Sequence, residues 1–336
     1  LTAHGLAPLR KVPEEVLALV NLRVLRLRRN KLASMPAGLG QMRQLVTVDF
    51  AENRLTQFPA GLCRCPLLED IDLSDNRIPS IPESISNLQY LRRLIMYHNK
   101  LFVLPDALRE CRNLRELNFF RNRLISIPEH LAALKQLTDV NVAGNRLKTV
   151  PATEEWKQLR RYAFMWNLVV VLPDFSGLHS LVQLQMNDNR LSELPTGLDA
   201  LVCCKALDAS MNDLTSFPVT VSRMTSLTTL NLRRNKLRDI SPTVGRLQAL
   251  VVVNLGENRL SALPPALGLC RAMKVLMVED NRLESLPLEL RQLVGLEKAS
   301  FAQNPPLLLP DAPTATNTDT VLFALAAICR DNGGWL

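Results

Sequence analysis

The residues of this chain whose types could do chemistry are its seven cysteines, its four histidines and its acidic side chains. Cys63 and Cys65, and likewise Cys203 and Cys204, are close enough in sequence to suggest a metal site, but neither spacing suits zinc. No Ser-His-Asp or Cys-His pattern includes one of the scattered histidines, His4, His98, His130 and His179. The sequence therefore predicts no catalytic residue, no metal site and no cofactor.

The overall composition excludes two further classes of protein. Of 336 residues, 47% are hydrophobic and 21% are charged, which is enough apolar material for a core and argues against disorder. No apolar run reaches the roughly 18 residues that a membrane-spanning helix needs, so we expect no membrane span.

An asparagine recurs along almost the whole chain at a fixed period. Successive members are 23 residues apart, except for two consecutive steps of 22, and they are Asn30, Asn53, Asn76, Asn99, Asn122, Asn145, Asn167, Asn189, Asn212, Asn235, Asn258, Asn281 and Asn304. Each belongs to a frame of the type Leu-x-x-Leu-x-Leu-x-x-Asn-x-Leu, as from Leu22 to Leu32, and a proline follows most of them six residues later, as at Pro36. Such a period indicates a solenoid of stacked repeats.

The spacing within the frame predicts the structure of each repeat. Leu-x-Leu places two side chains on one face of a short strand, and that face can be buried only if neighbouring repeats stack. Asparagine can bond the backbone groups that are freed where the chain turns, so we expect a ladder of asparagines. Proline then stops strand pairing. The sequence predicts thirteen parallel strands that form a concave sheet.

Over residues 12–310 this motif resembles the 23-residue Ras-group class of intracellular leucine-rich repeats, which occurs in Ras-pathway and Scribble-type polarity scaffolds. The resemblance implies an α/β solenoid, the leucine-rich repeat horseshoe, with a parallel concave β-sheet. Its convex side is expected to be mostly irregular, with 3-10 or short helical segments. The resemblance reaches the class only, because no residue singles out one member.

Departures from the period divide the chain. Residues 1–20 form a degenerate N-terminal half-repeat, to be interpreted either as a cap or as a cut through a longer repeat array. Residues 21–310 contain thirteen repeats, of which the two 22-residue ones lack a residue between the proline and the next frame. Residues 311–336 leave the period and are expected to form a linker and a capping helix.

Most cysteines fit the repeat. Cys65, Cys111 and Cys270 occupy an apolar position that carries Leu, Met or Trp in other repeats, and Cys204 replaces a frame leucine. Buried free cysteine behaves as a small apolar residue. Since neither end has a cysteine cluster, the sequence favours a reducing compartment and predicts a cytoplasmic protein. Association of this cytoplasmic protein with the cytoskeleton or a cilium is compatible with the same prediction.

The net charge of +8 raises the question of nucleic acid. Ten of the forty basic residues directly follow the repeated asparagines, as Arg54, Arg77 and Arg123 do. A cation there is typical of the repeat class, acidic residues interrupt the neighbouring sheet face, and aromatic residues do not alternate with the cations. The sequence argues against nucleic acid as partner, and RNA binding through this row is kept as a third hypothesis.

Function is therefore expected on the concave sheet, at positions that the frame leaves free. In the fourth to seventh repeats these positions carry side chains typical of protein-binding hot spots: Ile95, Tyr97, His98, Phe120, Arg121, Met165 and Trp166. An acidic group beside them, Asp70, Asp72 and Asp75, is expected to steer a basic partner surface. The alternative is that the middle side chains only pack on one another along the sheet.

The first functional hypothesis is a non-enzymatic scaffold that binds a protein partner on the concave face. The resemblance implies small GTPases, phosphatase subunits and cytoskeletal or ciliary proteins as partner classes, without choosing among them. The alternative is the recognition domain of a larger signalling enzyme, or a structural component of a ciliary or cytoskeletal assembly.

Overall fold

The computed structural model describes residues 8–151 and 153–305, and the chain divides into two compact units. Unit 1 is residues 1–169 and unit 2 is residues 170–336. In the described part of the chain, every helix is too short or too polar to cross a bilayer.

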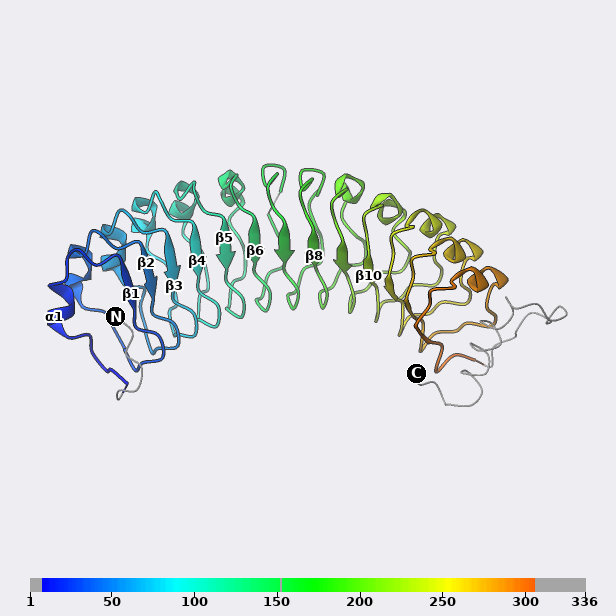
Figure 1. Ribbon diagram of the computed structural model, residues 1–336, viewed down its shortest axis with the longest axis horizontal. Coiled ribbons are helices and arrows are strands. Elements are labelled where there is room, and N and C mark those ends of the chain that lie inside the picture. The colour runs from blue at the N-terminus through cyan, green and yellow to red at the C-terminus, as the bar shows by residue number, and fades with distance from the viewer. Residues whose placement is uncertain (1–7, 152, 306–336) are drawn as a thin grey trace. The chain divides into compact units, whose positions relative to one another are not determined.

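Unit 1 alternates short strands with short helices (Figure 1). Its strands are β1 (Val24–Arg26), β2 (Thr47–Asp49), β3 (Asp70–Asp72), β4 (Arg93–Ile95), β5 (Glu116–Asn118), β6 (Asp139–Asn141) and β7 (Arg161–Ala163). The α-helix α1 (Glu14–Leu17) comes first, and the 3-10 helices are η1 (Ala37–Gln41), η2 (Ala60–Arg64), η3 (Glu83–Asn87), η4 (Asp106–Glu110) and η5 (Glu129–Ala133). The 3-10 helices line one edge of the unit, and the loops that follow the strands line the opposite edge.

Unit 2 repeats the same alternation. Its strands are β8 (Gln183–Gln185), β9 (Ala206–Asp208), β10 (Thr229–Asn231), β11 (Val252–Asn254), β12 (Val275–Met277) and β13 (Lys298–Ser300). Its 3-10 helices are η6 (Leu198–Ala200), η7 (Val219–Arg223), η8 (Pro242–Arg246), η9 (Pro265–Leu269) and η10 (Leu288–Gln292).

Within each unit the strands are parallel and follow one another in sequence order. The register advances by one repeat at each step, so Val24 pairs with Thr47 and, across the first 22-residue step, Asp139 pairs with Arg161. Frame side chains such as Leu25 and Leu94 point into the core and are fully buried. The predicted parallel sheet and the 3-10 segments are confirmed.

The predicted asparagine ladder is also confirmed. Asn122 shows its chemistry: its Oδ1 accepts from the backbone N–H of Leu101 at 3.0 Å, and its Nδ2 donates to the carbonyls of Met96 at 2.9 Å and Phe119 at 3.0 Å. Leu101 and Met96 belong to the preceding repeat. Each asparagine therefore closes its own loop and bonds it to its neighbour.

The residue before each ladder asparagine has a left-handed backbone, with φ between 50° and 64°. Twelve of these thirteen residues are not glycine, and only Gly144 is. This conformation costs an L-residue about 1–2 kcal/mol, and the ladder bonds on either side hold it in place. This conformation bends the chain away from the strand direction. The side chains at this position therefore belong to the loop that follows each strand.

The predicted shortening of the 22-residue repeats is visible in unit 1. Between β6 and β7 the described residues form turns in place of a 3-10 helix. Large aromatic side chains fill the core there: Trp156 is 1% exposed, its Nε1 donates to the carbonyl of Leu131 at 3.2 Å, and its ring meets Tyr162 edge-on.

At the start of unit 1, Leu9 completes the first rung of the ladder. Its N–H donates to Oδ1 of Asn30 at 2.8 Å, as the N–H of Leu32 does to Asn53 in the next repeat. The predicted linker and capping helix of residues 311–336 lie outside the described residues.

Candidate protein-binding surface

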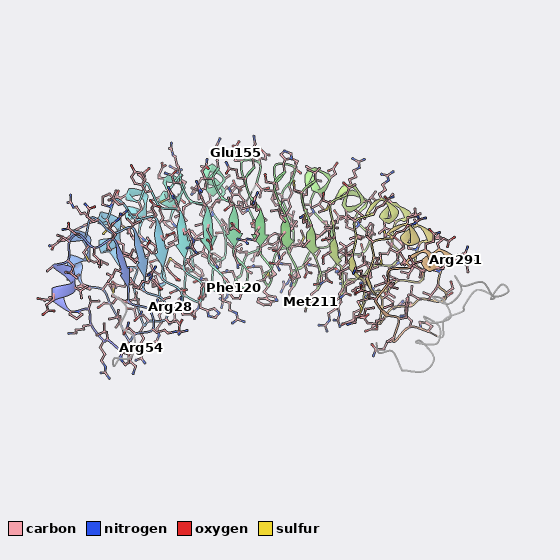
Figure 2. The ribbon with its side chains drawn as sticks, in the orientation of Figure 1. Arg28, Arg54, Phe120, Glu155, Met211 and Arg291 are labelled. Carbon is pink, nitrogen blue, oxygen red and sulfur yellow. The ribbon has the colours of Figure 1, made fainter. Side chains whose placement is uncertain are left out.

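The loops after β4, β5 and β7, all in unit 1, carry most of the side chains that the sequence predicts as a binding surface. Tyr97, His98 and Phe120 are partly exposed, whereas Arg121 is exposed and Trp166 is 43% exposed. We call these five residues the aromatic surface. Figure 2 shows Phe120 on the loop side of the strands, while Glu155 marks the opposite edge.

The rings of the aromatic surface form a continuous row. The Tyr97 and His98 ring centroids are 5.7 Å apart, His98 stacks on Phe120 at 5.7 Å, and Phe120 meets Trp166 at 6.0 Å. The guanidinium of Arg121 lies over the Phe120 ring, 5.2 Å from its centroid. The side chains thus hold one another in place before any partner arrives.

Phe120 and Trp166 meet although a whole repeat separates them. Two strand spacings place their backbones about 10 Å apart, and the repeat between them presents only Ala143 and Gly144. Gly144 has φ 64°, and a Cβ there would lie 3.1 Å from Cγ of Arg121. The missing side chain leaves the space in which the two rings converge.

A hydrogen-bonded chain ties the aromatic surface to the acidic group. Nδ1 of His98 lies 2.8 Å from Oδ1 of Asp75, and Nη1 of Arg121 lies 3.1 Å from Nε2 of His98. Since a guanidinium can only donate, Nε2 must accept and Nδ1 must carry the proton that it donates to Asp75. His98 is therefore held from both sides.

The three predicted acidic residues all have partners within the chain. Asp72 accepts from both the N–H and the hydroxyl of Ser74, at 2.9 and 2.6 Å, which closes the turn after β3. Asp70 lies 3.9 Å from Nη1 of Arg93. Asp72 also lies 3.9 Å from Nη1 of Arg28. The role of the acidic group in steering a partner stays a prediction.

Ile95 is placed differently from the expectation. It is only 7% exposed, because it lies on β4 in register between Asp72 and Asn118 and the side chains of both neighbouring strands flank it. It supports the sheet face from within. Met165, after β7, is partly exposed and stands beside Trp166.

Sequence reasoning missed the ion pairs that cross the sheet. Arg28 lies 2.8 Å from Glu52, Arg93 lies 2.8 Å from Glu116, and Arg161 bonds Asp139. Hydrogen bonds from Arg28 and Arg29 lower the pKa of Glu52. The available signal was opposite charge at matching positions of adjacent repeats, 22 to 24 residues apart.

Five of the six cysteines in the described part of the chain are buried core residues. Cys65 and Cys111 are fully buried, and burial raises the pKa of each thiol, to about 11 and about 12 respectively. Cys203 is exposed. Within residues 8–151 and 153–305, no three metal-ligating side chains come together. What the aromatic surface offers is apolar area, hydrogen-bond donors and a fixed shape, which suit recognition of another protein.

Two family models of the leucine rich repeat match the chain, at residues 20–78 and 226–247. No curated protein sequence matches it significantly. The leucine-rich repeat protein LIC12759 of Leptospira interrogans is 28% identical, with a TM-score of 0.84 over 90% of this chain and 77% of that chain.

Two similar structures are complexes. The Arabidopsis receptor kinase HAESA, solved with the peptide hormone IDA and the co-receptor SERK1, is 24% identical, with a TM-score of 0.69 over 88% of this chain and 56% of that one. A chain of the Toll–Spatzle complex of Drosophila is 21% identical, with a TM-score of 0.74 over 92% and 48%. The chain spans about half the length of these two, which show the fold alone. The asparagine period, the parallel sheet and the family matches together show a leucine-rich repeat solenoid fold.

Proposed function

We propose that the chain is a non-enzymatic scaffold that binds a protein partner on the aromatic surface of unit 1. The observation that carries the proposal is the ring row that ends at Trp166, a large side chain left 43% exposed although its neighbours are packed. Aromatic side chains and arginine supply most of the binding energy at protein interfaces.

Preorganisation supports the same conclusion. Stacking fixes Phe120, the guanidinium of Arg121 covers its ring, and His98 is bonded on both sides. Side chains that are already ordered lose less conformational entropy when a partner binds. HAESA and Toll, which share the fold, are each solved with a peptide or protein partner.

We propose further that the protein belongs to the Ras-group class and acts in the cytoplasm. The 23-residue step with its proline supports the class. Cysteines that replace leucine in the core support a reducing compartment. Small GTPases, phosphatase subunits and cytoskeletal or ciliary proteins are the partner classes that we propose on this basis.

The test compares partner capture by three proteins. The first is the unaltered chain, and the second carries Tyr97→Ala, Phe120→Ala and Trp166→Ala. The third is a control with Leu19→Ala, Leu67→Ala and Tyr90→Ala, which removes three apolar side chains that are 44%, 39% and 56% exposed elsewhere in unit 1. We expect a defined set of proteins to be lost only with the second, and its affinity for an isolated partner to fall at least about 30-fold.

A second variant guards against loss through unfolding. Arg121 is exposed, so Arg121→Glu keeps all four rings of the aromatic surface and reverses the charge at their centre. We expect it to keep the circular dichroism spectrum and the urea midpoint of the unaltered chain and to weaken the same partners. Unchanged capture by both variants would show that the rings serve only to pack on one another.

A further inference from the structure

Beyond the ladder asparagines, the loops of unit 1 form a second surface. Six segments compose it, each running from the residue after a ladder asparagine to the proline six residues after that asparagine: residues 31–36, 54–59, 77–82, 100–105, 123–128 and 146–151. We call this surface the loop edge. Its segments begin at the edge opposite the 3-10 helices (Figure 1), and the first five end at the proline that precedes the next 3-10 helix.

A cation begins every one of these segments, and all six are exposed: Lys31, Arg54, Arg77, Lys100, Arg123 and Arg146. Their backbones are fixed, because the N–H of Arg77 donates to Leu55 at 2.8 Å, that of Lys100 to Ile78 at 3.0 Å, and the others do likewise. The charges therefore recur at about one strand spacing, roughly 4.8 Å. Figure 2 shows the side chain of Arg54 extending beyond the loops.

These cations differ from the cations of the sheet face in lacking carboxylate partners. On the sheet face, Arg28 and Arg93 are each paired with a glutamate at 2.8 Å. None of the six loop-edge cations forms an ion pair with an acidic residue of the described part of the chain. The nearest carboxylates in sequence, Glu52 and Asp75, are already bonded to Arg28 and to His98.

Unit 2 provides an internal comparison. No aspartate or glutamate occurs in the six loop-edge segments of unit 1. The corresponding segments of unit 2 contain Glu193, Asp213, Asp239 and Glu284, and there Lys236 pairs with Asp213 at 2.6 Å. The repeat motif accounts for a cation after the asparagine in both units, but it does not account for the absence of acidic residues in unit 1.

The middle of the loop edge also exposes large apolar side chains. Phe102 is 49% exposed, Val103 is 48% and Ile125 is 43%. They come from adjacent repeats and follow Lys100 and Arg123 by two or three residues. An apolar group of this size without a cover, set directly among unpaired cations, marks an interaction surface.

We propose that the loop edge binds the surface of an anionic lipid bilayer, with Phe102, Val103 and Ile125 inserted between the headgroups and the cations bound to them. The combination selects this partner: basic residues are attracted to anionic lipid, and exposed apolar side chains two or three residues further along the chain bury themselves at the acyl boundary. A single-stranded nucleic acid would need stacking rings along the row, and this edge has one aromatic ring among its three apolar side chains.

The test measures co-sedimentation with two kinds of vesicle, at about 0.1 M salt. One is phosphatidylcholine alone, and the other contains about 30% phosphatidylserine. We expect the chain to bind only the second. Replacing three cations, with Arg77→Gln, Lys100→Gln and Arg123→Gln, should lower the partition coefficient about 100-fold, since each cation contributes about fivefold.

Two further variants separate the parts of the surface. Phe102→Ser, Val103→Ser and Ile125→Ser leave the charge unchanged, and we expect them to lower the partition coefficient about tenfold or more. The control Arg43→Gln, Arg64→Gln and Arg115→Gln removes the same charge from exposed positions outside the loop edge, and it should bind like the unaltered chain. The variant of Tyr97, Phe120 and Trp166 should also keep vesicle binding, because this inference is independent of the proposed protein-binding surface.

Three results would overturn the proposal. The first is binding to anionic vesicles that is no stronger than to phosphatidylcholine. The second is an equal loss with the Arg43, Arg64 and Arg115 control, which would mean that only net charge matters. The third is a combination of two outcomes: the variant of Phe102, Val103 and Ile125 binds vesicles as well as the unaltered chain does, and poly(U) RNA displaces the vesicles from the protein. That combination would assign the edge to nucleic acid.

Discussion

A ladder asparagine bonds backbone groups of two repeats at once, so its removal weakens both repeats. At Asn122, the buried N–H of Leu101 has the Oδ1 atom as its acceptor. We expect Asn122→Ala to lower the free energy of unfolding by about 2–3 kcal/mol, because that N–H loses its partner inside the core. Urea unfolding measures the change.

The matched control is Asn113→Ala. This asparagine is exposed, and its Nδ2 donates to the carbonyl of Gln89 at 2.7 Å. Its loss should cost about 0.5 kcal/mol, since water can replace the bond. Equal effects of the two substitutions would contradict a special role for the ladder.

The loop after each strand is the element that shapes the candidate surface, and Gly144 is where its shape can be tested. We expect Gly144→Gln to place a side chain between Phe120 and Trp166, and so to abolish partner capture although no aromatic residue is changed. The left-handed φ of 64° adds a stability cost of about 1 kcal/mol.

Capture assays and urea unfolding report the two effects of Gly144→Gln separately. The twelve non-glycine residues at equivalent loop positions show that the fold accepts a side chain there, so we expect the variant to fold. If it folds and still captures the same proteins, the contact between Phe120 and Trp166 is not needed for binding.

The elements also show which features the sequence could predict. Strands, asparagine ladder and shortened repeats follow from a frame that each repeat carries by itself, so the period was sufficient. The burial of Ile95, the pairing of Arg93 with Glu116 and the bonds on both sides of His98 depend on side chains of the adjacent repeats. A motif that is defined within one repeat carries no information about contacts between repeats. The sequence could therefore indicate which repeat positions form the candidate surface, but not which hydrogen bonds and ring contacts join them.

At the scale of the whole molecule, each repeat is stabilised by its own contacts and by those with its immediate neighbours. Removing one full repeat should therefore leave a folded chain. Deleting residues 123–145 joins Asn122 to Arg146 and restores the frame, while it removes β6 with Ala143 and Gly144. The rings of Phe120 and Trp166 then belong to adjacent repeats.

We expect this deletion to keep the circular dichroism spectrum per residue, to lower the free energy of unfolding, and to abolish partner capture because the anchors no longer have their spacing. The control deletes residues 31–53, which joins Asn30 to Arg54 and leaves the aromatic surface intact. It should lose comparable stability and keep the captured proteins. If both deletions capture the same set, the partner recognises side-chain composition alone. If the control fails to fold, the repeats of unit 1 depend on one another over a longer range than nearest neighbours.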